Sequence, residues 1–250
     1  MSSDIYNSYK GKAYRFTPIE ALIATITNKK LRFTRIDKYN DPLDCSPYLA
    51  PFNWEKYYNK NYLLNELKNI YFEKFFENFY ACCFCKEYDT ENSYLMWSHY
   101  GKDHSQLCFE IDFSKYDYLG CPSEIMYPND IVSFRDKYKN IIEGGYGLFV
   151  TTTKLKVWSY EKEVRLIIDI GKPENKSIIS NITERNIDVI LNPSIISKII
   201  FGVNSTKICE NKLLNILKIN NLNPNIEKML IDPISLKLKS IDYFQYYYNN

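Results

Sequence analysis

Strand-length apolar runs and helical patterns alternate irregularly along this chain, and that order limits its fold more than any other feature. Helical patterns predict helices over residues 17–30, 54–79, 97–99, 129–143, 145–158 and 206–217. Shorter apolar runs predict strands over residues 14–16, 31–34, 80–85, 106–113, 125–127, 161–169 and 199–202, with two more strands near the end. Strands that follow one another late in the chain favour an α+β fold with a mixed, mostly antiparallel sheet and flanking helices.

The start of the first helix and the domain organisation can also be predicted. Thr17 is expected to cap that helix, with Pro18 as its first helical residue and Glu20 as the capping-box partner. No repeat, low-complexity linker or composition break divides the sequence, so residues 1–250 are expected to form a single domain. Hydrophobic residues make up 45% and charged residues 25%, which is typical of a folded globular protein.

The net charge, the first residues of the chain and the cysteine spacing limit which partners and which cellular location we expect. The net charge of +2, from 32 basic and 30 acidic residues, gives no nucleic-acid footprint from charge alone. The first residues are polar and aromatic rather than charged and then apolar, and no apolar run approaches the roughly 20 residues of a membrane span. The 7 cysteines stand at irregular spacings typical of reduced thiols. We therefore expect a cytoplasmic protein without membrane contact.

The chain has only 2 histidines, and they lie close together. His99 and His104 lie within six residues of each other, and Trp97 stands two residues before His99. Imidazole is the only side chain whose ordinary pKa lies near neutrality, so any imidazole acid–base chemistry must occur there. The alternative is a histidine that packs in the core against one backbone carbonyl, with Trp97 as a packing residue.

A second candidate site is the segment Trp158–Arg165. Because strand side chains alternate between faces, Glu161, Glu163 and Arg165 are expected to share one face. Paired carboxylates beside a fixed cation can have well-separated pKa values and so divide the acid and base roles. The alternative is an edge strand with solvated surface charges.

Two further patterns are less specific. Asn40 and Asp41 precede Pro42, a combination that favours a rigid turn with no ligand. Cys82, Cys83 and Cys85 lack the usual zinc-knuckle spacing, so buried thiols acting as small hydrophobes are expected rather than a metal site. Neither a Rossmann glycine motif nor a P-loop is present in the sequence.

Taken in order, these segments resemble the bacterial family catalogued as domain of unknown function twenty-nine seventy-one. The resemblance spans residues 14–202, and a helix and strands over 203–250 follow it. Arg15 stands where the family usually has lysine, and Ser105-Gln106 replaces a glycine often found there. The matching elements are Tyr14-Arg15-Phe16, Leu31–Thr34, Asn40–Asp44, Cys83-Phe84, Leu95–Tyr100 with His104, Leu107–Asp112, Lys154, Trp158, Glu161, Glu163, Arg165 and Ile200–Gly202.

The order of these elements is similar to that of ADP-ribosyltransferase-like folds, and this likeness implies NAD as the cofactor. Glu163 would stabilise the cation that develops when the nicotinamide–ribose bond breaks, and Glu161 or Arg165 would tune that carboxylate. Arg15 would pair with a phosphate, and His99 would act as a base or hold Glu163 in place. The remaining residues that the likeness assigns to cofactor binding are Tyr14, Asn40, Asp41, Trp97, Tyr100 and His104.

The leading functional hypothesis is an NAD-dependent ADP-ribosyltransferase-like enzyme or an NAD glycohydrolase, related to toxins or defence, with a protein or nucleic-acid acceptor. One alternative is a non-catalytic binding module whose polar residues form a buried network. Another is a metal-dependent nuclease using His99, His104, Asp41 and Glu163. Convergence of Arg15, His99 and Glu163 on one open cleft would favour the transferase, whereas a closed cluster would favour the binding module.

Overall fold

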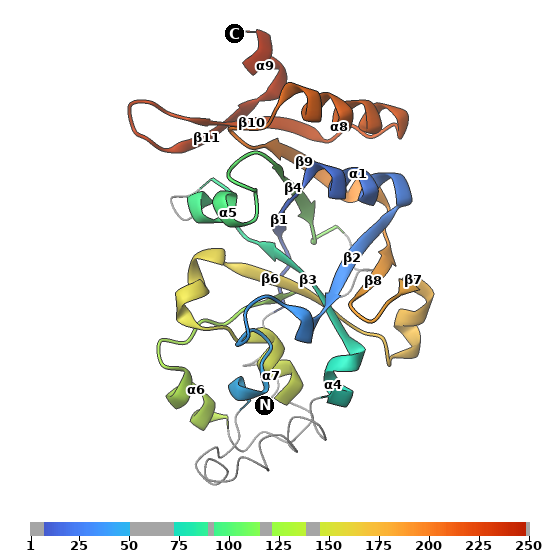
Figure 1. The fold of residues 1–250 in the computed structure, drawn as a ribbon, viewed down its shortest axis with the longest axis vertical. Coiled ribbons are helices and arrows are strands. Elements are labelled where there is room, and N and C mark those ends of the chain that lie inside the picture. Colours follow the sequence, from blue (N-terminus) through green and yellow to red (C-terminus); the bar gives the residue numbers. More distant parts are fainter. Residues whose placement is uncertain (1–7, 51–72, 90–92, 116–121, 139–145, 249–250) are drawn as a thin grey trace.

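The chain forms the expected α+β fold around a large mixed sheet (Figure 1). The computed structural model describes residues 8–50, 73–89, 93–115, 122–138 and 146–248. The strands are β1 (Lys12–Thr17), β2 (Lys30–Arg35), β3 (Phe79–Cys85), β4 (Leu107–Asp112), β5 (Ser123–Glu124), β6 (Glu163–Asp169), β7 (Ile179–Ile182), β8 (Asn186–Ile190), β9 (Ile196–Phe201), β10 (Asn225–Ile231) and β11 (Leu238–Asp242). The helices are α1 (Ile19–Asn28), α4 (Glu73–Asn78), α5 (Ser93–His99), α6 (Ile131–Lys137), α7 (Tyr146–Thr152), α8 (Lys207–Ile219) and α9 (Tyr243–Tyr248).

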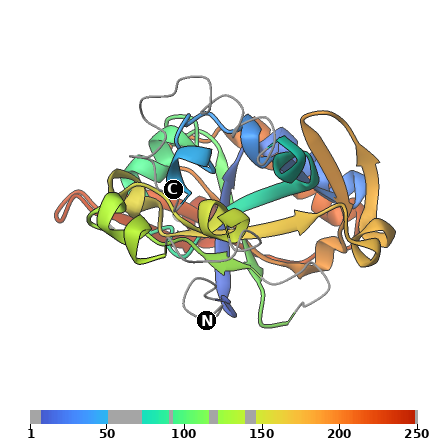
Figure 2. The same ribbon diagram turned by 90° about the horizontal axis from the view of Figure 1, so that it is seen from below.

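The strands of the described residues join in one sheet, in the order β11-β10-β9-β4-β1-β3-β2-β8-β7, with β6 paired to β3 and β5 to β6. Their pairings are antiparallel except that β9 and β10 run parallel. The β10–β11 hairpin and the β7–β8 hairpin project on opposite sides of the molecule (Figures 1 and 2). The expected mixed, mostly antiparallel sheet is confirmed.

The sheet is split along one edge of β3. The other edge of β3 pairs with β6 along its whole length. On the split edge, Thr34 of β2 pairs with Ala81, whereas Tyr14 of β1 pairs with Cys85. Residues 82–84 lie between these two pairs and have no partner in either β1 or β2. The two strands therefore diverge from β3 and leave a gap in the middle of the sheet.

Apolar side chains cover both faces of the sheet around this gap. Leu22 of α1 and Leu213 of α8 belong to one buried cluster, and these two helices contact each other over the same face. Met96 and Trp97 of α5 belong to a second cluster, which includes Phe16 of β1. Because side chains of successive strand residues alternate, β1 contributes to both layers. The gap consequently lies between two packed layers rather than at the surface of one.

The first helix begins differently from the sequence prediction. Its N-cap residue is Pro18 rather than Thr17, and no side chain of the cap residue accepts a hydrogen bond. Thr17 is instead the last residue of β1 and is buried in the sheet. The backbone N–H of Ile19 donates to Oε1 of Gln106 at 2.9 Å. A contact with the segment before β4 thus replaces the expected capping box.

The segment before β6 also differs from the prediction. Helix α7 ends at Thr152 instead of continuing to about residue 158, and a 3₁₀ segment, η5 (Lys156–Glu161), follows it. Lys162 has a φ of 42°, in the left-handed region, so β6 starts at Glu163 and Glu161 precedes it. The strand expected over 125–127 is replaced by β5 and by a single bridge from Met126 to Thr153.

The remaining differences lie at the ends of the sheet and outside the described residues. Strands β7 and β8 were not predicted, and the tyrosine-rich end forms the short helix α9. Of the helix expected over 54–79, residues 54–72 lie outside the described residues, as do 139–143 of the helix expected over 129–143. The helix expected over 206–217 is confirmed as α8, with Thr206 as its N-cap residue. None of the described helices combines the length and the apolar character needed to cross a membrane.

Candidate functional site

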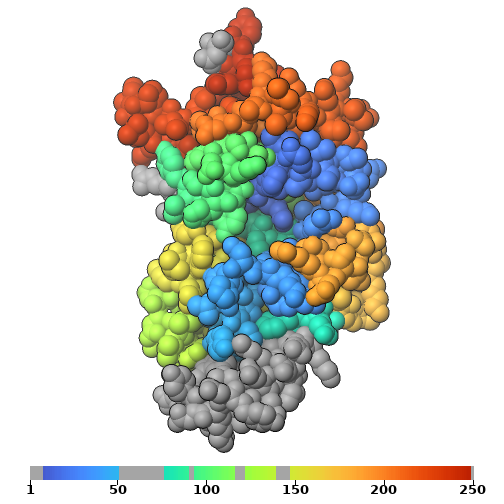
Figure 3. Space-filling model, viewed as in Figure 1, coloured from blue at the N-terminus to red at the C-terminus, as the bar shows by residue number. Residues whose placement is uncertain are grey.

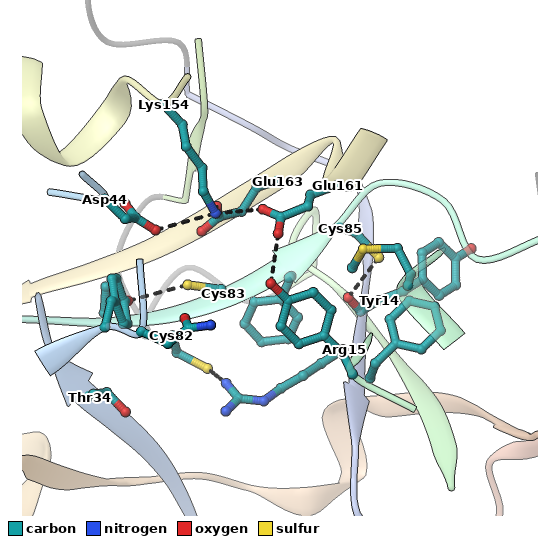
Figure 4. Close-up of a pocket in the computed structure, with 17 residues that line it drawn as sticks. Tyr14, Arg15, Thr34, Asp44, Cys82, Cys83, Cys85, Lys154, Glu161 and Glu163 are labelled. Carbon is teal, nitrogen blue, oxygen red and sulfur yellow. Dashed lines mark hydrogen bonds and ion pairs between the residues drawn. The ribbon is translucent and has the colours of Figure 1, made fainter. Parts of the chain in front are cut away.

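The gap between β1 and β2 opens into a cavity of about 230 Å³. In Figure 3 the surface is hollowed where teal β3 lies deep between green α5 and the light-blue segment after β2. Figure 4 shows the polar side chains that converge there. The lining residues are Tyr14, Arg15, Phe16, Thr34, Tyr39, Asn40, Asp44, Ala81, Cys82, Cys83, Phe84, Cys85, Met96, Tyr100, Lys154, Glu161 and Glu163.

Three carboxylates surround the ammonium group of Lys154 on one wall of this cavity. The Nζ atom of Lys154 lies 2.6 Å from Glu161 Oε2, 3.2 Å from Glu163 Oε2 and 3.3 Å from Asp44 Oδ2. All four side chains are at most 8% exposed, so water does little to screen these charges. Burial acts to lower the pKa of Lys154, but the three carboxylates outweigh it and raise that pKa. Lys154 is therefore a permanent cation that holds the cluster together.

A second cation closes the cluster from the side of β6. The fully buried guanidinium of Arg165 donates through Nε to Glu163 Oε1 at 2.7 Å and to both oxygens of Asp44 at 3.1 Å. It also donates to Thr151 O at 3.2 Å and lies 5.2 Å from the ring centroid of Tyr39. A guanidinium can satisfy several acceptors at once in this way because its donors form a planar fork.

Local structure explains why residues from distant segments meet here. The left-handed Lys162 ends η5 and redirects the chain into β6, so Glu161 and Glu163 both line the cavity although only Glu163 belongs to the strand. The backbone N–H of Glu163 donates to the hydroxyl of Tyr127 at 3.0 Å. Asp44 is presented by a turn in which Asp41 Oδ1 accepts the backbone N–H of Leu43.

The two glutamates have opposite pKa shifts. Burial and the charge of Glu163 raise the pKa of Glu161, despite hydrogen bonds from Lys154 and Tyr100. Burial acts to raise the pKa of Glu163 as well, but Arg165 and Lys154 outweigh it and lower that pKa to about 2. One carboxyl group thus remains ionised while its neighbour binds a proton more readily. This division is the one expected from paired carboxylates beside fixed cations.

Arg15 lies across the cavity from the glutamates (Figure 4). Its guanidinium donates to the sulfur of Cys82, a weak acceptor, and stands 5.9 Å from the ring centroid of Phe84. Burial lowers the pKa of Arg15, and no carboxylate among the described residues contributes to that shift. A guanidinium stays charged under these conditions. Arg15 therefore presents a half-buried positive charge to the cavity, and no carboxylate of the described residues neutralises it.

The structure places His99 outside the cavity and its neighbour Tyr100 inside it. His99 is the last residue of α5, and its Nδ1 lies 3.2 Å from the hydroxyl of Tyr160. Tyr100 donates to Glu161 Oε1 at 2.7 Å. Burial, with the Glu161 charge second, raises the pKa of Tyr100, so its hydroxyl stays a donor. His99 therefore does not converge with Arg15 and Glu163 on the cavity, and its neighbour Tyr100 is the side chain that reaches a carboxylate.

Trp97 of α5 belongs to the core, and the partly buried His104 lies against it. Trp97 is fully buried and donates from Nε1 to the carbonyl of Tyr88 at 3.1 Å. The ring of His104 stacks on that of Trp97 with centroids 6.3 Å apart, and its Nε2 lies 3.3 Å from Ser98 Oγ. Burial lowers the pKa of His104. These two residues fit the packing alternative, since neither lines the cavity.

Several residues of the site were not predicted as functional. Asp44 and Lys154 stand at the centre of the ion cluster, and Thr34 and Tyr39 line the cavity. Of the predicted turn residues, Asn40 lines the cavity, whereas Asp41 is engaged in the turn. Asp44 is one residue of the same turn motif, so its position among acidic and amide side chains was the available signal. Lys154 is one of the elements that carry the family resemblance, and that resemblance was the available signal for it.

Cys83, which lines the cavity, is a protonated thiol. Cys83 Sγ lies 3.3 Å from the hydroxyl of Tyr39, and burial together with Glu163 raises the pKa of Cys83 to about 12. Within the part of the chain that the structure describes, no three His, Cys, Asp or Glu side chains are placed to hold a metal ion. His99, His104, Asp41 and Glu163, which the nuclease hypothesis requires, each contact different partners.

Comparisons with protein-family models, curated proteins and solved structures found no match for this chain. The essential features of the site are Arg15, which no carboxylate in the described part of the chain neutralises, the two glutamates with opposite pKa shifts, and the cavity between Arg15 and these glutamates.

Proposed function

We propose that this protein cleaves the nicotinamide–ribose bond of NAD, as an ADP-ribosyltransferase-like enzyme or an NAD glycohydrolase. The observation that carries the proposal is that Arg15 and the pair Glu161 and Glu163 line one cavity from opposite walls. NAD combines anionic phosphates with a ribose carbon that becomes positively charged during cleavage. A cavity with a guanidinium on one wall, unpaired with any carboxylate of the described residues, and with carboxylates on the other complements both ends of such a substrate.

In this reaction the bond between ribose C1′ and the nicotinamide nitrogen breaks, and its electron pair leaves with nicotinamide. The positive charge left on the ribose is stabilised by Glu163, which stays ionised because Arg165 and Lys154 lower its pKa. Water or an acceptor nucleophile then adds to C1′ and gives its proton to Glu161, whose pKa is raised. Tyr100 donates to Glu161 and so fixes the carboxylate that accepts this proton.

The size of the cavity limits which part of the substrate it holds. Ligand sites typically enclose about 300–1,000 Å³, whereas this cavity measures about 230 Å³. The nicotinamide ribose alone would occupy it, with Phe16 and Tyr14 as the aromatic side chains near the ring. The rest of the dinucleotide would extend beyond Arg15.

The test is nicotinamide release from NAD by the purified protein, with water and with a cell lysate as the source of acceptor. We expect release by the wild type and a loss of about 100-fold or more in Glu163→Gln, as for removal of one electrostatic stabiliser elsewhere. Glu174→Gln is the matched control, because Glu174 is an exposed glutamate outside the cavity. Equal rates in the wild type and Glu163→Gln, or no release and no NAD binding by the wild type, would refute the proposal.

A second candidate is a non-catalytic binding module with a structural ion network. It is favoured by the observation that Asp44 and Glu163 are only 6% and 4% exposed and are satisfied by Lys154 and Arg165. On this alternative, NAD raises the melting temperature without being consumed. The nicotinamide assay and a thermal-shift measurement on the same sample separate the two candidates.

A further inference from the structure

A row of aromatic side chains lies beside the opening of the cavity, and we call it the aromatic arc: Tyr100, His99, Tyr160 and Trp158. Tyr100 and His99 lie at the end of α5, whereas Tyr160 and Trp158 belong to η5. Successive ring centroids along the arc are 6.3, 6.1 and 6.0 Å apart. In Figure 3 the green surface of α5 and the yellow surface of η5 lie one above the other at the side of the hollow. Two segments that are distant in the sequence therefore present one continuous set of rings.

Both ends of the arc reach the ion cluster in the cavity wall. At one end, the hydroxyl of Tyr100 donates to Glu161 Oε1 at 2.7 Å. At the other end, the ring centroid of Trp158 is 5.2 Å from Nζ of Lys154. In the proposed reaction Glu161 accepts the proton of the incoming nucleophile. A molecule held by the arc would therefore lie next to the carboxylate that takes its proton.

The rings of the arc are open to solvent, unlike the core ring of Trp97 in the same helix. The two residues at the end of α5 are exposed, and the two in η5 are partly exposed. His99 meets its two neighbours at interplanar angles of 81° and 67°, so these rings do not stack face to face on one another. Accessible flat rings of this kind are the side chains on which unpaired nucleobases stack.

The exposed charges around the arc leave a small positive excess. The three carboxylates of the ion cluster are at most 6% exposed and pair with Lys154 inside the cavity wall. Lys156, at the start of η5, is exposed, and its Nζ donates to the amide oxygen of Asn129 at 2.8 Å. In the turn after α5, the exposed Lys102 is offset by its neighbour Asp103. Lys156 thus complements the backbone phosphates of a nucleic acid, while most of the binding would come from stacking.

We propose that the aromatic arc binds single-stranded nucleic acid by stacking its unpaired bases, and that such a base is the acceptor of the ADP-ribosyl group. The second part rests on the proposed function. A nitrogen of the base bonds to ribose C1′, nicotinamide leaves with the electron pair of the broken bond, and Glu161 takes the proton of that nitrogen. A base within a duplex is already paired and stacked, so the arc selects single strands.

The test is fluorescence anisotropy of the full chain with labelled oligonucleotides of about 12 nucleotides. We expect a mixed-sequence single strand to bind more tightly than its duplex, and more tightly than an abasic strand that keeps the phosphates without the bases. His99→Ala and Tyr160→Ala should each weaken binding of the single strand by about fivefold or more, the loss typical of one stacked base. Phe244→Ala is the matched control, because Phe244 is an exposed aromatic residue of α9 outside the arc and the cavity. A melting curve shows that each variant is folded.

An acidic peptide of the same charge as the oligonucleotide separates a nucleic-acid partner from a protein one. The inference is overturned if the wild type does not bind the single strand, if the abasic strand or the peptide binds equally well, or if neither variant binds more weakly than Phe244→Ala. Strand binding without nicotinamide release would count against the proposed function alone, and release without strand binding against this inference alone. Where both occur, mass spectrometry of the strand after incubation with NAD should show an added ADP-ribosyl group, and its absence overturns the assignment of the acceptor.

Discussion

At the scale of single residues, Glu161 and Glu163 show how one buried cluster gives two chemically different carboxyl groups. Glu163 has a lowered pKa, so the stability it contributes is present above its unfolded pKa of about 4.3 and is lost as the pH falls toward about 2. Glu161 has a raised pKa, so its favourable contribution is present below the unfolded pKa and is lost as the pH rises through the folded value. Ionisation of Glu161 in the folded protein therefore lowers the free energy of unfolding.

This difference predicts the pH dependence of Glu161→Gln. An amide cannot ionise, and its one oxygen can accept from Tyr100 or from Lys154 but not from both in their present positions. The variant therefore lacks the pH-dependent loss of stability that the wild type undergoes as Glu161 deprotonates. The free energy of unfolding of the variant relative to the wild type should therefore rise with pH above about 4.3. Urea unfolding between pH 4 and pH 8 measures it. A difference that is constant or falls over this range would show that the pKa of Glu161 is not raised.

At the scale of elements, the turn after α5 is held against the end of β9. Lys102, Asp103 and His104 all have φ values in the left-handed region. Gly202, directly after β9, approaches this turn so closely that an added Cβ would lie 2.2 Å from the carbonyl oxygen of His104. The contact fixes the position of α5, which ends next to Tyr100 at the cavity.

Gly202→Ala should therefore lower the free energy of unfolding by about 2 kcal/mol or more, because backbone must move to accommodate the methyl group. Gly11→Ala is the control, since an added Cβ there meets the Tyr9 ring, which can rotate away. Urea unfolding of both variants provides the comparison. Equal stability of the two variants would mean that the turn yields easily and does not fix α5.

Local sequence patterns were enough to predict most helices and strands, but not the elements whose formation depends on partners far away in the sequence. Strands β3 and β4 and helix α8 were predicted because their apolar residues follow the strand or helix period. Strand β7 was missed because it lies at a sheet edge and its side chains are mostly exposed, although the alternating Ile187 and Val189 of β8 were a usable signal. In the site, Glu161, Glu163 and Arg165 were found from their spacing. Asp44 belongs to the turn pattern of residues 40–44, but its pairing with Arg165 was not predicted because only the folded chain brings the two side chains together.

At the scale of the whole molecule, the C-terminal elements are joined by an ion network separate from the cavity. Glu210 of α8 pairs with Lys228 of β10 at 2.7 Å, and both side chains are at most 3% exposed. Tyr243 and Tyr247 of α9 donate to Glu210 Oε2 at 3.0 and 2.6 Å. Since none of these residues lines the cavity, stability and ligand binding should be separable.

Lys228→Met tests this separation. It leaves Glu210 buried without its cation, which typically costs about 3–5 kcal/mol of unfolding free energy. Lys218→Met, at an exposed lysine in the last turn of α8, should cost little. At a temperature where Lys228→Met is still folded, its rate of nicotinamide release should equal that of the wild type. A lower rate in the folded variant would show that the network and the cavity are coupled.

The divergence of β1 and β2 from β3 has a mechanical consequence. The two strands pair with β3 at different places and not with each other, so the distance between them depends on the twist of the sheet. Because β1 and β2 do not pair with each other, a small change in that twist would widen or narrow the passage beside Arg15 at no cost in hydrogen bonds between these two strands. Admission of a ligand would then be a deformation of the sheet itself rather than the motion of a loop.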